Sequence, residues 1–161
     1  MRRVGSETER QRFQAAIRPC GVEDAAAVGA IAQEASGLAN WTEESYRESL
    51  SWHGIVALVC EEEGNVTGFI FGRQAVDEGE IFNLAVRAAT RRRGEGGALL
   101  KAALEEFRAR GVSRVFLDVR ESNESAIAFY EKWGFCKKGR RSGYYRNPEE
   151  AAMVMEMKLT G

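Results

Sequence analysis

A glycine-rich segment between two apolar runs constrains the fold of this chain more than any other feature. The strand-like run 81–86 precedes the segment Arg91-Arg92-Arg93-Gly94-Glu95-Gly96-Gly97, and a helix-like run begins at Ala98. Glycines at such a junction permit a tight turn and a close approach of the backbone to a ligand. The first turn of the helix offers unpaired N–H groups and the positive end of its dipole. The segment therefore predicts a strand, a turn and a helix that together bind an anion, especially a pyrophosphate.

Two common nucleotide-binding motifs do not fit this segment. A P-loop closes with Lys-Ser or Lys-Thr, whereas Ala98 follows the glycines here. The dinucleotide fingerprint needs glycine or alanine where Leu99 stands. The pattern that remains is Arg-x-x-Gly-x-Gly from Arg91 to Gly96, in which the arginines supply charge and fork-shaped donors. Arginine runs also occur on solvated faces and in nucleic-acid-binding patches, but the strand before and the helix after favour the anion site.

The length and charge of the chain narrow the classes of function. Its 161 residues suffice for one domain with a hydrophobic core. We expect this domain over residues 15–161, after a flexible, charged leader over residues 1–14. A net charge of −1 argues against a general nucleic-acid binder. No apolar run approaches the length of a membrane span, and the N-terminus lacks the apolar region of a secretory signal, so we expect neither nucleic acid nor a membrane as partner.

The cysteines and the single histidine limit the disulfides and metal sites that this chain can form. Cys20, Cys60 and Cys136 are odd in number, far apart and without metal-ligand spacing, which suits reduced thiols in the cytoplasm. We expect Cys60 and Cys136 to be core residues of apolar strands. His53 is the only histidine, so a multi-histidine metal site cannot form. We expect His53 in a loop or at a strand edge, and no metal cofactor.

The pattern of apolar residues and turn signals predicts a mixed α/β (α+β) domain rather than a doubly wound parallel sheet. Thr42 and Asn123 are suitable helix caps, and Glu63-Gly64-Asn65 is a turn signal between two strands. The expected elements, in order, are a strand at 17–19, helices from about 24 and after 42, strands at 55–60, 66–73 and 80–86, a helix from 98 to near 111, a strand at 114–119, a helix after 123, and strands from 135 and at 153–159.

The C-terminal half of the sequence resembles the GNAT superfamily of N-acetyltransferases, and most closely its RimI type, the ribosomal-protein alanine N-acetyltransferases. Two stretches carry the resemblance most clearly, Leu-Asp-Val-Arg-Glu-Ser-Asn at 117–123 and Ala-Ile-Ala-Phe-Tyr-Glu-Lys-Trp-Gly-Phe at 126–135. The resemblance extends over roughly residues 16–159. Further agreement lies at 41–46, 80–86, 91–97 and 140–145.

This resemblance implies an enzyme that transfers an acetyl group from acetyl-CoA to a primary amine, by direct attack in a ternary complex. It also implies a central mixed, mostly antiparallel sheet with helices on both faces. Backbone groups of Leu84, Ala85 and Val86 would pair with the amides of the pantetheine arm. Asn123 would contact the cofactor, and it can cap a helix at the same time. The pyrophosphate would be held by the residues of the glycine-rich segment, Arg91, Arg92, Arg93, Gly94, Glu95, Gly96 and Gly97.

Amide formation from a thioester requires a neutral amine and a proton for the leaving thiolate. In the RimI type a carboxylate acts as the base and a tyrosine protonates the thiolate, and the matching residues here are Asp118 and Tyr130. Tyr130 would also contact the cofactor. The family pattern usually has glutamate where Asp118 stands, so the base could act through a water, or Glu80 could take the role. The alternatives are a packed core aromatic for Tyr130 and solvated or ion-paired carboxylates for Asp118 and Glu80.

The expected acceptor is the N-terminal α-amine of a protein, such as a ribosomal protein that begins with alanine. An α-amine has a pKa of about 7.7–8.0 against about 10.4 for lysine, so more of it is neutral at physiological pH. Recognition would fall to Trp41, Tyr144 and Tyr145, with the acidic loop Asp77-Glu78 suited to a basic peptide. The loop is alternatively a solvated turn, and the two tyrosines a packed strand pair.

Two other functions stay open at this stage. The acceptor could be a small amine such as a polyamine or an aminoglycoside. Asn40 leaves room for this, because the family frequently has proline before the tryptophan at position 41. Gly97 stands where the family commonly has arginine or lysine, which bears on acceptor identity and on cofactor affinity. A non-catalytic acyl-CoA sensor would keep the anion site but lose the acid and base, and the presence of Tyr130 argues against it. A monomer and a homodimer are equally compatible with the sequence.

Overall fold

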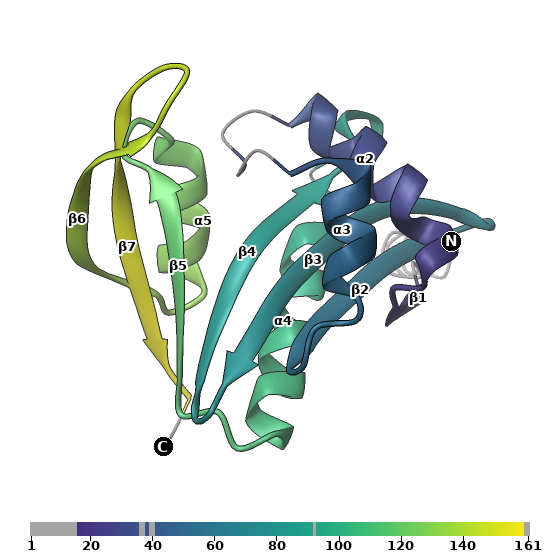
Figure 1. Ribbon diagram of the computed structural model, residues 1–161, viewed down its shortest axis with the longest axis horizontal. Coiled ribbons are helices and arrows are strands. Elements are labelled where there is room, and N and C mark those ends of the chain that lie inside the picture. Colours follow the sequence, from purple (N-terminus) through teal and green to yellow (C-terminus); the bar gives the residue numbers. More distant parts are fainter. Residues whose placement is uncertain (1–15, 36–37, 39–40, 92, 160–161) are drawn as a thin grey trace, which may run out of the picture.

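A seven-stranded sheet forms the centre of the computed structural model, which describes residues 16–35, 38, 41–91 and 93–159 (Figure 1). The strands lie in the order β1-β2-β3-β4-β5-β7-β6, and all neighbours are antiparallel except β4 and β5. The sheet is therefore mixed and mostly antiparallel, as predicted. The strands are β1 (Ala16–Pro19), β2 (Ile55–Glu62), β3 (Asn65–Ala75), β4 (Glu78–Val86), β5 (Arg114–Arg120), β6 (Cys136–Tyr145) and β7 (Glu150–Lys158).

Helices cover both faces of the sheet, which confirms the predicted architecture (Figure 1). Two lie on the face of β2 to β4 that is nearer the viewer, and two lie behind β2 to β5. The leader expected over residues 1–14 lies outside the described residues. The α-helices of the described chain are α2 (Ala25–Glu34), α3 (Glu43–Ser49), α4 (Glu95–Ala109) and α5 (Glu124–Lys132), with short 3-10 helices η1 (Val22–Asp24) and η2 (Ala88–Thr90).

Each face of the sheet has its own hydrophobic core. On the side of α2 and α3, the buried rings of Tyr46, Phe69 and Phe71 pack edge to face. On the opposite side Phe107 of α4 is buried, and Gly79 makes room for it, since a β-carbon there would lie 2.9 Å from Phe107 Cε1. This contact fixes α4 against the sheet, and with it the position of the helix N-terminus.

The central strands β4 and β5 pair only over their first residues and then separate. Their ladder ends at the pair Ile81–Leu117. At this point β4 contains a β-bulge, because Phe71 of β3 pairs with Asn83 while the next residue pairs with Ile81. Phe82 is thus the extra residue, and a bulge of this kind bends its strand. The bend leaves the edge of β4 beyond Ile81 without a ladder to β5 among the described residues.

The bulge also changes which side chains face which core. Ile81 before it belongs to the core beneath α4, and Leu84 and Val86 after it pack against that same core. Ala85 lies in the other core, beneath α2 and α3. Since strand side chains otherwise alternate, an unbroken strand would place Leu84 on the opposite side from Ile81. The extra residue thus turns Leu84 and Val86 toward α4.

Both predicted helix caps are confirmed, but the start of α4 is not. Thr42 Oγ1 accepts a hydrogen bond from the Ser45 N–H at 3.1 Å, and Asn123 Oδ1 accepts one from the Ala126 N–H at 3.2 Å. We predicted that the helix after the glycine-rich segment begins at Ala98, whereas α4 begins three residues earlier. The turn needs only one residue, Gly94, whose φ of 84° is accessible to glycine at little cost.

The predicted positions of the cysteines are partly wrong. Cys60 is buried, as expected, but Cys136 is exposed at the start of β6. This strand lies at an edge of the sheet, and almost its whole length is exposed. Cysteine next to the apolar Phe135 is typical of a buried strand, so the local sequence does not indicate this exposure. All three cysteines are free thiols.

Candidate active site

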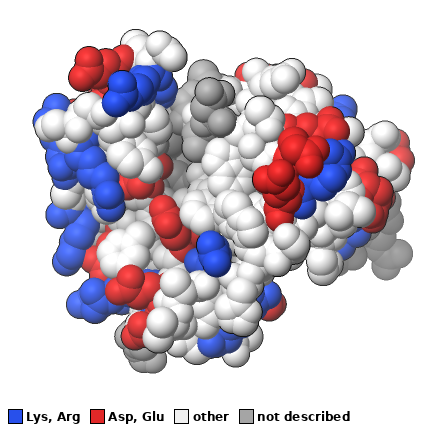
Figure 2. Space-filling view, viewed as in Figure 1, with Lys and Arg blue, Asp and Glu red and all other residues white. Residues whose placement is uncertain are grey.

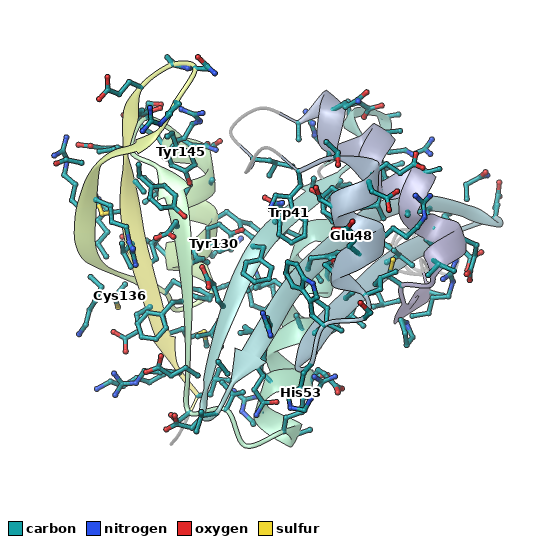
Figure 3. All side chains as sticks on the ribbon, viewed as in Figure 1. Trp41, Glu48, His53, Tyr130, Cys136 and Tyr145 are labelled. Carbon is teal, nitrogen blue, oxygen red and sulfur yellow. The ribbon has the colours of Figure 1, made fainter. Side chains whose placement is uncertain are left out.

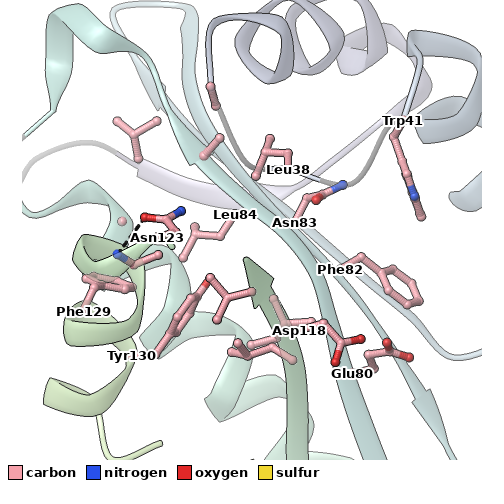
Figure 4. Close-up of a pocket in the computed structure, with 18 of the residues that line it drawn as sticks. Leu38, Trp41, Glu80, Phe82, Asn83, Leu84, Asp118, Asn123, Phe129 and Tyr130 are labelled. Atoms are coloured by element: carbon pink, nitrogen blue, oxygen red, sulfur yellow. Dashed lines mark hydrogen bonds between the residues drawn. The ribbon is translucent and has the colours of Figure 1, made fainter. Parts of the chain in front are cut away.

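A cleft of about 700 Å³ opens where β4 and β5 separate (Figure 4). β4, β5 and α5 form much of its lining, and β6 and the segment before α3 complete it. The structure therefore brings together residues that lie more than a hundred positions apart in the sequence. The predicted site residues that line this cleft are Trp41, Glu80, Leu84, Ala85, Val86, Arg91, Gly96, Asp118, Asn123, Tyr130, Tyr144 and Tyr145.

One end of the cleft is the N-terminus of α4, which has the properties of an anion site. Gly94 is its N-cap residue, and no side chain caps the helix. The first N–H groups of an α-helix have no intrahelical acceptor, and together with the helix dipole they favour a phosphate. At Gly96, which lines the cleft, an added β-carbon would meet nothing closer than 3.8 Å. These residues fit a pyrophosphate held mainly by backbone donors.

The side chains of the arginine run are less available than the sequence suggested. Arg93 forms a two-pronged ion pair with Glu62 at the end of β2, with both N···O distances at 3.0 Å. Arg91 lines the cleft, and its Nε donates to the Val86 carbonyl at 3.3 Å. Arg92 lies outside the described residues. Of the two arginines that the structure describes here, Arg91 thus has the clearer access to a ligand in the cleft.

Glu95 and Gly97 serve the helix start rather than the cleft wall. Glu95 is buried, and its carboxylate accepts a hydrogen bond from Thr90 Oγ1 at 3.3 Å, which ties η2 to α4. Gly97 lies under the indole ring of Trp133 at the end of α5. Neither side-chain position lines the cleft. Their backbone N–H groups remain part of the helix terminus that would face a phosphate.

Tyr130 is both a core aromatic and a cleft residue, so its packing is compatible with the predicted role of proton donor. Its side chain is buried between Phe129 and Phe135, with ring centroids 5.2 Å and 5.6 Å away. It also lines the cleft, where Figure 4 shows it beside Leu84. Burial raises the pKa of the Tyr130 phenol, with a smaller contribution from Tyr145. The phenol therefore carries its proton throughout the neutral pH range.

Two carboxylates face each other across the point where β4 and β5 part. Glu80 and Asp118 lie side by side at the floor of the cleft (Figure 4). Asp118 is largely buried and lies 3.6 Å from Arg141 Nε, so the ion-paired alternative holds for it. Glu80 forms no ion pair among the described residues. Desolvation, and next the negative charge of Asp118, raise the pKa of the Glu80 carboxyl.

An aromatic wall borders these carboxylates, and sequence analysis identified only part of it. Trp41 contacts Phe82, with ring centroids 5.4 Å apart, and Trp52, at 5.8 Å. Phe82 and Trp52 are 6.3 Å apart, so the three rings form one cluster. Phe82 reaches it because of the β-bulge, which no spacing in the sequence announces. Figure 3 shows Trp41 and Tyr145 on opposite sides of Tyr130.

Two hydrogen-bonded groups that the sequence did not reveal support the cleft. Asn83, which is buried and lines the cleft, donates from Nδ2 to the Tyr46 hydroxyl at 3.0 Å. On the other side, Arg120 lies 4.4 Å from the centroid of the Tyr145 ring and donates to the Pro148 carbonyl at 3.1 Å. Arg120 thus joins the end of β5 to the hairpin between β6 and β7, and it holds Tyr145 at the cleft.

Residues 26–135 match the model of the acetyltransferase (GNAT) family, and the chain belongs to this family. It is accordingly an enzyme, an acetyl-CoA-dependent N-acetyltransferase, as the resemblance implied. Within the described residues, no three or more His, Cys, Asp or Glu side chains are arranged to hold a metal ion. None of the helices described here is long and apolar enough to cross a membrane.

Several relatives are ribosomal-protein alanine N-acetyltransferases. The chain is 36% identical over 101 residues to the ribosomal protein bS18-alanine N-acetyltransferase of Escherichia coli, an alignment that covers 62% of this chain and 68% of the relative. It is 33% identical over 146 residues to a putative enzyme of the same name from Bacillus subtilis, which covers 89% of this chain and 95% of the relative. The crystal structure of the Escherichia coli enzyme superposes with a TM-score of 0.83 at 30% identity, covering 92% of this chain and 96% of that one.

Proposed function

We propose that this enzyme acetylates the N-terminal α-amine of a protein, and that its natural acceptor is a ribosomal protein that begins with alanine. The observation that carries the proposal is the meeting of Tyr130, Glu80 and Asp118 at one cleft, where β4 and β5 separate. An acid and a base at the same opening are what acetyl transfer to an amine requires. The names of the relatives supply the class of acceptor.

The edge of β4 would bind the cofactor arm. Beyond Ile81 this edge has no ladder to β5 among the described residues, so the backbone groups of Leu84, Ala85 and Val86 are available to an amide-containing chain. The N-terminus of α4 lies at the end of the same cleft and would hold the pyrophosphate. When bound, acetyl-CoA supplies the acetyl group as a thioester.

The carboxylates would receive the proton of the amine. Both Glu80 and Asp118 lie at the floor of the cleft, and Asp118 is engaged with Arg141 while Glu80 is not paired among the described residues. The raised pKa of Glu80 makes its carboxylate a stronger base than an ordinary glutamate. We therefore assign proton removal to Glu80, directly or through a water, with Asp118 maintaining its basicity. This assignment favours Glu80, which the sequence analysis gave as the alternative to Asp118.

Tyr130 would return a proton to the departing thiolate. The ordinary pKa values are about 10 for a phenol and about 8.5 for a thiol, a gap that makes the transfer uphill in water. Burial raises the pKa of Tyr130, but a thiolate formed in the same cleft is desolvated too, and its pKa rises for the same reason. The two values therefore stay close enough for transfer.

Thiol release from acetyl-CoA by the purified protein tests this function. The acceptors are a peptide with a free N-terminal alanine, the same peptide with its N-terminus blocked, lysine peptides and polyamines. Turnover only with the free N-terminus is the expected result. Turnover with polyamines alone would contradict the proposed acceptor while leaving the family intact, and cofactor binding without any turnover would identify a sensor. The three free thiols agree with the cytoplasm as its compartment, which we include in the proposal.

A further inference from the structure

A second groove begins where the active cleft ends. It has a volume of about 810 Å³, within the range of ligand sites. The two hollows share Glu80, Phe82, Leu117 and Asp118 in their linings, so they form one continuous surface. The groove runs from these residues along the paired part of β4 and β5 toward His53, which Figure 3 shows at the far end of the sheet from Tyr145.

Some charged side chains of this groove have hydrogen-bond or ion-pair partners and others do not. Arg73 Nε donates to the His53 carbonyl at 3.0 Å, and its guanidinium lies 5.3 Å from the centroid of the Trp52 ring. Arg141 is paired with Asp118 at 3.6 Å. Glu78 and Glu80, by contrast, form neither an ion pair nor a hydrogen bond through their carboxylates among the residues that the structure describes. A carbonyl does not neutralise the Arg73 guanidinium, and Arg73 lies opposite Glu80 in the register of β3 and β4. The groove lining therefore holds three carboxylates, Glu78, Glu80 and Asp118, against two guanidiniums, Arg73 and Arg141, and its net charge is −1.

Glu78 and Glu80 point into the groove from the same side of β4. The residues between and after them, Gly79 and Ile81, are buried, whereas both glutamates are exposed. Figure 2 shows acidic side chains at the centre of this face, while basic ones gather on the side of β6. A positively charged ligand that lies along β4 would thus meet one carboxylate after another.

We propose that this groove binds the acceptor polypeptide downstream of its acetylated residue, and that Glu78 selects a lysine or arginine at the third or fourth position. The proposal rests on the function proposed above. The groove gives the acceptor chain a path away from the reaction centre, on the side of Glu80 opposite Leu84, Ala85 and Val86, where the cofactor arm is proposed to bind.

The preferred position follows from strand geometry. Residues two apart in a strand are separated by about 6.8 Å, so Glu78 and Glu80 differ by that distance along β4. An extended peptide covers the same distance in two residues. If the first residue lies at Glu80, the third lies at Glu78, and a long basic side chain from the third or the fourth residue reaches its carboxylate.

A lysine scan tests the proposal. Peptides that begin with alanine carry one lysine at position 2, 3, 4, 5 or 6 of an otherwise neutral sequence, and kcat/KM is measured by thiol release at low salt. We expect a maximum at position 3 or 4, about three- to fivefold above the neutral peptide, the size typical of a partly exposed ion pair. Salt at about 1 M should reduce this maximum, because it screens exposed charges.

Variants at position 78 identify the carboxylate responsible. Glu78→Gln should abolish the maximum, so that kcat/KM no longer depends on the position of the lysine, and Glu78→Lys should favour a glutamate in place of the lysine. Glu105→Gln is the matched control, since Glu105 is exposed on α4, on the opposite face of the sheet, and should retain the wild-type scan.

The outcomes separate this proposal from the function on which it rests. A flat scan in the wild-type enzyme, or a maximum that survives Glu78→Gln, would overturn the groove assignment while N-terminal acetylation stands. Absence of turnover with every alanine peptide would overturn both.

Discussion

The indole ring of Trp133 lies so close to Gly97 that a β-carbon at position 97 would be 2.8 Å from Trp133 Cζ2. The ring belongs to the last turn of α5, and the glycine to the first turn of α4, so this contact holds the two helices together behind the cleft. Any side chain at position 97 would compete with the Trp133 ring for the same space.

Substitution of the two helical glycines should therefore have opposite effects on stability. Gly97→Ala should lower the free energy of unfolding by about 1–3 kcal/mol through overpacking against Trp133. Gly96→Ala meets nothing closer than 3.8 Å and should raise it by about 0.5–1 kcal/mol, because alanine is the better helix former. Urea unfolding of both variants beside the wild type measures the difference. Equal effects would show that the ring of Trp133 yields to a methyl group without cost.

Loss of the Tyr130 hydroxyl should remove turnover and leave binding. In Tyr130→Phe the ring still fills its place between Phe129 and Phe135, but the proton donor is gone. We expect kcat to fall about 10²-fold or more, the usual contribution of a general acid. The dissociation constant of acetyl-CoA, from calorimetry, should stay within about twofold. Wild-type turnover in this variant would return Tyr130 to a purely structural role.

The charge of Asp118 should set the pH at which activity appears. Its negative charge raises the pKa of the Glu80 carboxyl, so its removal lowers that pKa. Since Glu80 must be ionised to act as base, activity is lost as the pH falls through its pKa. In Asp118→Asn the acidic limb of the kcat/KM profile should therefore move to lower pH. Glu80→Gln should abolish this limb, and a limb that persists in it would assign proton removal to another group.

The ion pair at the start of the domain should stabilise the fold above pH 4. Asp24 is buried and accepts hydrogen bonds from Arg18 at 2.8 Å and 3.0 Å and from the Gly21 N–H at 2.8 Å. The Arg18 hydrogen bond is the main cause of the lowered pKa of Asp24. A pKa lowered in the folded state gives stability that is present above the unfolded value, about 3.9, and is lost as the pH falls toward the folded value.

Asp24→Asn should accordingly lower the free energy of unfolding by about 1–3 kcal/mol at pH 7. Below pH 4 its difference from the wild type should shrink, since the wild-type carboxyl then becomes protonated. Glu23→Gln is the neighbouring control, because Glu23 is exposed and its substitution should change stability by no more than about 0.5 kcal/mol. A difference that is independent of pH would assign the loss to packing rather than to the charge.

Most of the architecture could be predicted because its signals are local. Thr42 and Asn123 are caps whose side chains bond the next turn, and the strand–turn–helix at the glycine-rich segment follows from residues adjacent in the sequence. The start of α4 was misplaced because glycine is a poor helix former. One left-handed residue, Gly94, sufficed for the turn, and the next two glycines became helical.

The site was predictable only as far as a familiar pattern reached. Tyr130, Asp118 and Asn123 belong to such a pattern, and they line one cleft. Trp52 and Phe82 have no pattern of their own, since their contact depends on a bulge and on a loop distant in the sequence. The pairing of Arg93 with Glu62 was likewise unpredictable, because it joins the loop before α4 to the end of β2, which only the folded chain brings together.

The bulge at Phe82 affects the directions from which the two substrates reach the reaction centre. It turns Leu84 and Val86 toward the side of α4 while Glu80 stays on the opposite side of the sheet. The donor and the acceptor can therefore approach from opposite sides of the sheet and meet at the gap between β4 and β5. If the proposed function holds, a bulky acceptor does not have to pass the spent donor in order to leave. The geometry then imposes no order in which the two substrates must bind.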